Sequence, residues 1–155
     1  MSLESLYQEL ILDHSKRPKG KGIAEATERS AISHQRNPIC GDEVTLQVRL
    51  TDDGAGIRDV TWDGAGCSIS QASASMLVAL VDEERDLADG APMPVGDAHV
   101  LIEKFREALR SRGAIPLDEE TFGDAAALSG VSKYTARVKC AMLAWVALED
   151  TLARA

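Results

Sequence analysis

Apolar and polar residues alternate most clearly near the middle of the chain. Val44 to Leu50 (VTLQVRL) alternates with a period of two, which is typical of a β-strand with one buried face. Thr51 to Gly54 is a turn sequence, and Gly56 to Trp62 (GIRDVTW) supplies a returning strand. The pattern therefore predicts a β-hairpin that residues 63–66 end, and residues 24–34 are a weaker strand candidate.

Apolar residues at helical spacing predict four helices. The first covers residues 3–15, and a proline and a glycine soon after end it. The second begins near Ser68, with Ser68 or Ser70 as the expected N-cap. The third and fourth cover residues 97–112 and 132–152, and a linker (DGAPMP) precedes the third.

The apolar stripe of the last helix alternates steps of four and three residues, which places its aromatic side chains in the core. The stripe comprises Tyr134, Val138, Ala141, Trp145, Leu148 and Leu152. A small three-stranded antiparallel sheet with helices packed on it indicates an α+β fold. With 155 residues, we expect one domain spanning 1–155.

The charge balance narrows the choice of partners. Seventeen basic residues against twenty-five acidic ones give a formal net charge of -8, a field that repels phosphate backbones. We therefore expect no nucleic-acid partner. Because the chain has no run of eighteen apolar residues and no signal-peptide pattern at its start, we expect no membrane partner and a cytoplasmic location.

The three cysteines form no disulfide framework, since their number is odd and their spacing is wide. Each could be a small buried apolar side chain. Their surroundings favour a site instead, because Cys40 precedes the hairpin in NPICGD and Cys67 follows it in GAGC. The start and end of a hairpin lie side by side, so we expect Cys40, Asp42 and Cys67 to be neighbours.

Two thiols and a carboxylate are suitable ligands for Zn²⁺, and Cys140 can supply the fourth. Arg137 shares a helix face with Cys140, and Lys139 is adjacent, so a cationic neighbourhood favours the thiolate. Taken alone, Asp42 could be a turn residue and Arg137 a surface charge paired with an acid.

Other polar residues carry weaker signals. The three histidines, His14, His34 and His99, fall in no metal-binding pattern, and we expect them at the surface or at helix ends. The serines between 68 and 75 have no evident His or Asp partner, so we expect close helix packing there. The absence of HxE with PCxxC, and of CxxC, argues against zinc deaminases and thioredoxin-like proteins.

Three segments together resemble a known family. They are NPICGD at 37–42, GAGCSISQASASM at 64–76 and LSGVSKYTARVKC at 128–140, and the opening helix with Asp13-His14 also matches. Nearly the whole chain thus resembles the U-type iron–sulfur cluster assembly proteins, which include IscU and the NifU N-terminal domain. Lys139 in place of a histidine, and a longer stretch around 85–125, resemble the SufU branch.

The resemblance implies an IscU/SufU-like fold with a family-type insertion around 85–125. It implies Cys40, Asp42, Cys67 and Cys140 as metal ligands, Cys40 as the sulfur acceptor and Arg137 as a supporting residue. The implied activity is a zinc-dependent sulfurtransferase that takes persulfide sulfur from a SufS-type cysteine desulfurase and serves downstream iron–sulfur assembly proteins. Stand-alone catalysis on small molecules is not expected.

Two alternatives stay open on the same ligands. The chain could be a scaffold on which a transient [2Fe–2S] cluster is assembled and passed on. It could also be a non-catalytic protein whose zinc is purely structural.

Overall fold

The computed structural model describes residues 3–38 and 41–155, and these residues form an α+β fold. The elements in chain order are α1 (Leu3–Lys16), β1 (Ser30–Asn37), β2 (Asp42–Leu50), β3 (Gly56–Ala65), α2 (Ser68–Leu87), β4 (Met93–Pro94), α3 (Val95–Arg110), α4 (Glu119–Phe122), the 3₁₀ helix η1 (Gly123–Lys133) and α5 (Thr135–Arg154).

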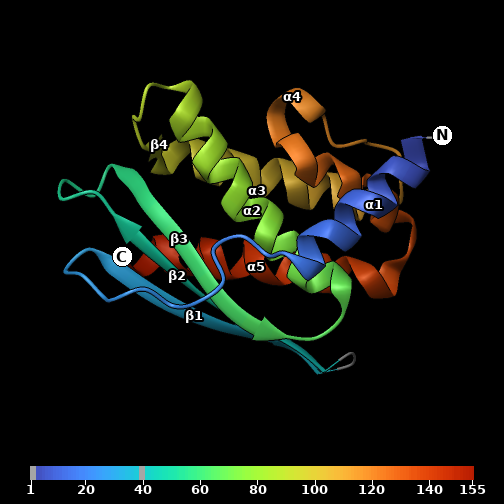
Figure 1. Cartoon of the computed structure of the whole chain (residues 1–155), viewed down its shortest axis with the longest axis horizontal. Helices are drawn as coiled ribbons and strands as arrows, with labels where there is room; N and C mark the ends of the chain where they lie inside the picture. Colours follow the sequence, from blue (N-terminus) through green and yellow to red (C-terminus); the bar gives the residue numbers. More distant parts are fainter. Residues whose placement is uncertain (1–2, 39–40) are drawn as a thin grey trace.

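The strands form one antiparallel sheet in the order β1-β2-β3-β4 (Figure 1). The expectation of three strands was wrong, because Met93 pairs with Ile57 and adds a fourth. This strand is two residues long and lies in the proline-containing linker. A strand that short has no periodicity for sequence reasoning to detect.

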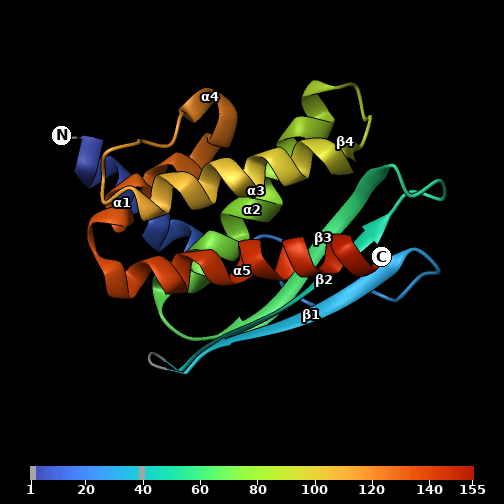
Figure 2. The same ribbon diagram turned by 180° about the vertical axis from the view of Figure 1, so that it is seen from behind.

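The helices cover one face of the sheet, as the two opposite views show (Figures 1 and 2). α5 packs across β1 and β2, α2 packs against β3, and α3 lies against α5 farther from the sheet. The core between these layers includes Leu46, Trp62 and Trp145, each fully buried. The Trp145 ring stacks on Phe105 of α3, with ring centroids 4.0 Å apart.

Two expectations about strand ends need correction. The strand expected at 24–34 is β1 at 30–37, whose polar sequence lacks clear alternation. The hairpin's second strand continues to Ala65 rather than ending at Trp62. Gly64 allows this, because a Cβ there would lie 2.4 Å from the carbonyl oxygen of Glu43.

The exposure of two side chains, Tyr134 and His14, was not evident from the sequence. Tyr134 was expected in the core and is 61% exposed, because it lies just before α5 begins. His14, expected at the surface or at a helix end, does lie in the last turn of α1, but it is buried. Its ring nitrogens lie 2.7 Å from Ser75 Oγ and 2.9 Å from Asp124 Oδ2, so the residue links α1, α2 and η1.

The sequence showed no His or Asp partner for the serines between 68 and 75, and the structure shows that His14 is the partner of Ser75. Ser75 is fully buried and also accepts a hydrogen bond from the amide of Lys19, which makes it a structural tie rather than an accessible nucleophile. Within the described part of the chain, no helix has the length and apolar character needed to cross a membrane.

Candidate metal centre

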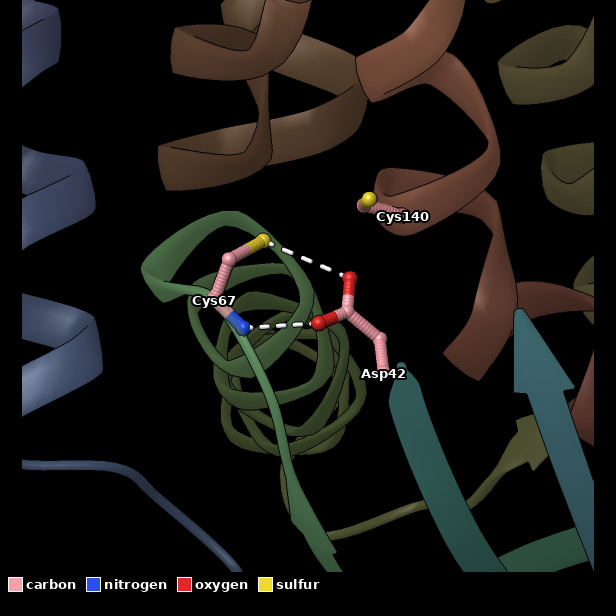
Figure 3. A group of neighbouring side chains, drawn as sticks. All are labelled: Asp42, Cys67 and Cys140. Carbon is pink, nitrogen blue, oxygen red and sulfur yellow. Dashed lines mark hydrogen bonds between the residues drawn. The ribbon is translucent and has the colours of Figure 1, made fainter. Parts of the chain in front are cut away.

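Three of the four expected ligands gather at one end of the sheet. Asp42 begins β2, Cys67 lies immediately before α2, and Cys140 belongs to α5 (Figure 3). One ligand atom from each lies within 4.8 Å of the others. Cys40, expected as the fourth ligand and the sulfur acceptor, lies outside the described residues.

Asp42 and Cys67 are joined by two hydrogen bonds (Figure 3). The backbone amide of Cys67 donates to Asp42 Oδ1 at 2.8 Å, and the Cys67 thiol donates to Oδ2 at 3.4 Å. Cys67 is the N-cap of α2 and makes no side-chain cap, so the expected caps Ser68 and Ser70 were wrong. The carboxylate from β2 instead satisfies the amide at the positive end of this helix.

The backbone before Cys67 is shaped to admit this carboxylate. Gly66 has a φ of +142°, a value that side-chain-bearing residues rarely adopt. Asp42 is 1% exposed and lies directly over the Cα of Gly66. The GAGC segment thus contributes space as well as a thiol.

Cys140 is more deeply buried than the sequence suggested. We expected it beside the core, yet it is 3% exposed, whereas Cys67 is only half-buried. The side-chain amide of Asn37 donates toward the Cys140 sulfur at 3.8 Å, and the thiol lies 3.8 Å from the carbonyl of Ala136.

The donor set fits a tetrahedral metal ion. Bond lengths of about 2.3 Å to sulfur and 2.0–2.2 Å to oxygen place neighbouring ligand atoms about 3.4–3.8 Å apart. The pair Cys67 Sγ and Asp42 Oδ2, at 3.4 Å, already has this separation. The most widely separated pair of ligand atoms, within 4.8 Å, would need to move closer by about 1 Å to reach the tetrahedral separation.

Three basic residues stand close to Cys140 in the sequence. Lys133 at the end of η1, and Arg137 and Lys139 near the start of α5, are exposed, and no ion pair among residues 3–38 and 41–155 involves them. On a chain with a net charge of -8, this makes a local cationic surface. The alternative that Arg137 is a surface charge paired with an acidic neighbour therefore has no support among the described residues.

A groove opens beside the centre, with a volume of about 620 Å³. We call it the α1–α5 groove; its lining includes Tyr7 and Ile11 of α1, Ile69 of α2, and Lys133, Tyr134 and Arg137. Ile69 follows Cys67 by two residues, and Arg137 precedes Cys140 by three. The groove is therefore lined by sequence neighbours of both cysteines, although neither cysteine is itself among the lining residues.

The histidines take no part in the cluster formed by the described residues. His34 is exposed on β1 and bonds to Thr45 Oγ1 at 2.7 Å, and His99 is exposed on α3. Sequence reasoning expected glycine at 66 to let the backbone approach a neighbouring group closely, and Asp42 is that group. It missed Asn37, which stands inside the first cysteine motif but is brought to Cys140 only by the fold.

The chain belongs to the family described as the NifU-like N-terminal domain, which matches residues 6–141. It is 36% identical over 153 residues to the zinc-dependent sulfurtransferase SufU of Bacillus subtilis, covering 99% of this chain and 93% of the relative. It is 34% identical over 153 residues to the iron–sulfur cluster assembly scaffold protein IscU of Streptococcus pyogenes, covering 98% of this chain and 86% of that one.

Solved structures show the same fold. A crystal structure of a hypothetical protein superimposes with a TM-score of 0.80 at 34% identity, covering 98% of this chain and all of the other. A candidate scaffold protein for the SUF system from Fervidobacterium islandicum AW-1 gives a TM-score of 0.71 at 30% identity, covering 97% and 99% of the two chains.

Proposed function

We propose that this chain is an iron–sulfur cluster assembly protein that holds zinc and accepts persulfide sulfur from a SufS-type cysteine desulfurase. The observation that carries the proposal is the convergence of Asp42, Cys67 and Cys140, with ligand atoms within 4.8 Å. Cys40 would complete the set, since it precedes Asp42 by two residues. The similarity to a zinc-dependent sulfurtransferase supports the same assignment.

The chemistry is a transfer of sulfane sulfur without net oxidation. The Cys40 thiolate attacks the outer sulfur of the partner's cysteine persulfide, and a new S–S bond forms on Cys40. The original S–S bond breaks, and its electron pair leaves with the partner's cysteine as a thiolate. Bound zinc would supply a positive charge that keeps the ligand thiols deprotonated before transfer.

The surroundings of the other two cysteines support Cys40 as the acceptor. Cys140 is in the core, and Cys67 is tied to Asp42 at the start of a helix. In the sequence Cys40 stands between Pro38 and Gly41, a composition typical of loops, and a side chain on a loop could leave a ligand position without disturbing a helix. Lys139, when protonated, cannot replace a departing ligand as a histidine could.

The α1–α5 groove is the surface on which the desulfurase would dock. Its apolar walls end in the cations Lys133 and Arg137, so a partner segment with apolar and acidic side chains complements it in shape and charge. Arg137 would then support transfer by attracting the anionic persulfide. Downstream iron–sulfur assembly proteins would collect the sulfur from Cys40.

The second candidate function is a scaffold for a transient [2Fe–2S] cluster. It is favoured by the 34% identity to an IscU scaffold protein, and it would use the same ligands. Fresh protein that is colourless with about one zinc supports the relay. Brown protein containing iron supports the scaffold.

The deciding experiment measures desulfurase turnover of cysteine with zinc-loaded protein, metal-stripped protein and no protein. We expect stimulation by the zinc-loaded form alone. Each Cys→Ser variant is then tested, and the added sulfur is located by peptide mass mapping, with expected loss of persulfide in Cys40→Ser. A fully active Cys40→Ser variant with sulfur on Cys140 would contradict the assignment.

The proposal covers the chain as one domain. The family-type insertion around 85–125 would act through α3, which packs against α5 and so supports the helix that carries Cys140. A cytoplasmic location agrees with thiols serving as ligands, because a reducing compartment keeps them from forming disulfides.

A further inference from the structure

Asn37 and Asp42 pair with one another where β1 ends and β2 begins. They are the last residue of β1 and the first of β2, and they are partners in the antiparallel register. The amide of Gly41 donates to the Asn37 carbonyl at 2.9 Å. Both side chains are buried, at 4% and 1% exposure.

Asp42 offers hydrogen-bond acceptors to one described cysteine, and Asn37 offers a donor to the other. Asp42 presents carboxylate oxygens to Cys67, which acts as the donor to them. Asn37 presents an N–H donor to the sulfur of Cys140 at 3.8 Å. Of the two described cysteines, Cys140 is therefore the one whose sulfur meets a hydrogen-bond donor from this pair.

An N–H donor matters most when the sulfur is charged. A hydrogen bond to an ionised acceptor is roughly twice as strong as one between neutral groups, and burial strengthens it further. It also draws electron density from the sulfur, which becomes a weaker nucleophile toward another sulfur. Hydrogen bonds from outside the ligand shell orient and tune metal ligands in the same way.

We infer that Asn37 is a positioning residue that retains Cys140 as a metal ligand and disfavours it as a sulfur acceptor. The inference rests on the proposed function and deepens it, since it explains how one ligand among three thiols stays in place while another transfers sulfur.

The test compares Asn37→Ala with Arg36→Ala, a variant of the exposed neighbour on the same strand. Zinc retention is measured by competition with a chromogenic chelator. We expect about 10- to 100-fold weaker retention for Asn37→Ala and no change for Arg36→Ala. If Asn37→Ala does not fold, as judged by circular dichroism, Asn37→Ser replaces it because its hydroxyl is too short to reach Cys140. Equal retention in all folded forms would overturn the inference.

A second measurement locates sulfur after incubation with the desulfurase and cysteine. We expect the share of persulfide on Cys140 to rise several-fold in the Asn37 variant. An unchanged distribution would overturn the sulfur-directing role even if zinc were lost faster. If the natural chain itself received no sulfur, the proposed function would fail, while the chelator competition would still decide whether Asn37 holds the ligand.

Discussion

The carboxylate of Asp42 occupies the space that a side chain at Gly66 would need. A Cβ at Gly66 would lie 2.2 Å from Asp42 Oδ1 and 2.7 Å from its carboxyl carbon. These atoms belong to a buried group whose oxygens are already held by the Cys67 amide and thiol. The ligand cannot move aside without giving up these bonds, so Gly66 is required by the metal centre itself.

Gly66→Ala should therefore weaken zinc binding. We expect about a 10- to 100-fold loss of affinity, since a displaced Asp42 no longer completes the centre. Gly22→Ala is the matched control, because Gly22 also has a positive φ, of +114°, but no atom within 4 Å of its Cβ position. Chelator competition measures both. Equal losses would attribute the effect to backbone strain instead of the collision with Asp42.

Removing the metal should lower the thermal midpoint without unfolding the chain. Without the ion, the Cys67 and Cys140 thiols and the Asp42 carboxylate crowd one end of the sheet, and the binding energy no longer adds to folding. The core around Trp62 and Trp145 does not depend on the centre and should persist. Differential scanning calorimetry with and without chelator measures the shift. An identical melting curve after verified metal removal would refute this expectation.

Asp42→Ala and Asp42→Asn should separate two roles of one carboxylate. Asn keeps an oxygen that can accept from the Cys67 amide, while Ala leaves that amide at the start of α2 without its acceptor. We expect Ala to cost about 1–2 kcal/mol more in the metal-free form. Urea unfolding of the stripped proteins measures this.

With zinc bound, both Asp42 variants should exchange the metal faster, because the carboxylate is the hardest ligand among soft thiolates. Both should also alter sulfur transfer while remaining folded. Failure to purify Asp42→Asn as a folded protein would count against this view of Asp42 as a ligand whose loss leaves the fold intact.

The ion pair between Arg106 of α3 and Glu149 of α5 should add stability that acid removes. The guanidinium makes hydrogen bonds of 2.7 and 3.1 Å to the two Glu149 oxygens. These bonds, opposed in part by burial, lower the pKa of Glu149. A carboxylate with a lowered folded-state pKa stabilises the fold above its unfolded value, about 4.3, and this contribution is lost as the pH falls through the folded value.

We expect Glu149→Gln to be less stable than the natural chain at pH 7, by under about 1 kcal/mol because the pair is partly exposed. The difference should shrink as the pH falls below about 4. Glu107→Gln, an exposed carboxylate of α3, is the control with the same change in charge. Urea unfolding from pH 3 to 7 measures the difference. A gap between Glu149→Gln and the natural chain that is the same at every pH would contradict this assignment.

Sequence reasoning found the elements whose signal is local. The alternation of VTLQVRL and GIRDVTW predicted the β2–β3 hairpin, and apolar spacing predicted α1, α2, α3 and α5. Position on a hairpin was also enough to place Asp42 beside Cys67, because the register of an antiparallel pair brings its two ends together.

The parts that were missed depend on contacts between distant residues. The ring nitrogens of the buried His14 form hydrogen bonds with Ser75 and Asp124, which are 61 and 110 residues away in the sequence. No spacing pattern in the sequence identifies either residue as a partner of His14. The N-cap of α2 was misassigned because its amide is satisfied from β2 rather than by a nearby serine. Tyr134 fits the apolar stripe of α5 by spacing, but the helix begins one residue later.

The three described ligands come from positions 42, 67 and 140 of a 155-residue chain. During synthesis from the N-terminus, the β2–β3 hairpin and the start of α2 can form well before α5 exists. On the proposed ligand set, such a nascent chain carries Cys40, Asp42 and Cys67 but lacks Cys140, so the four-ligand site is incomplete. If these residues hold zinc as proposed, tight loading would wait until the ribosome has made α5 and this helix has packed across the sheet. Bound metal would then mark chains whose last helix is in place, and truncated chains that lack α5 would leave the ribosome without metal.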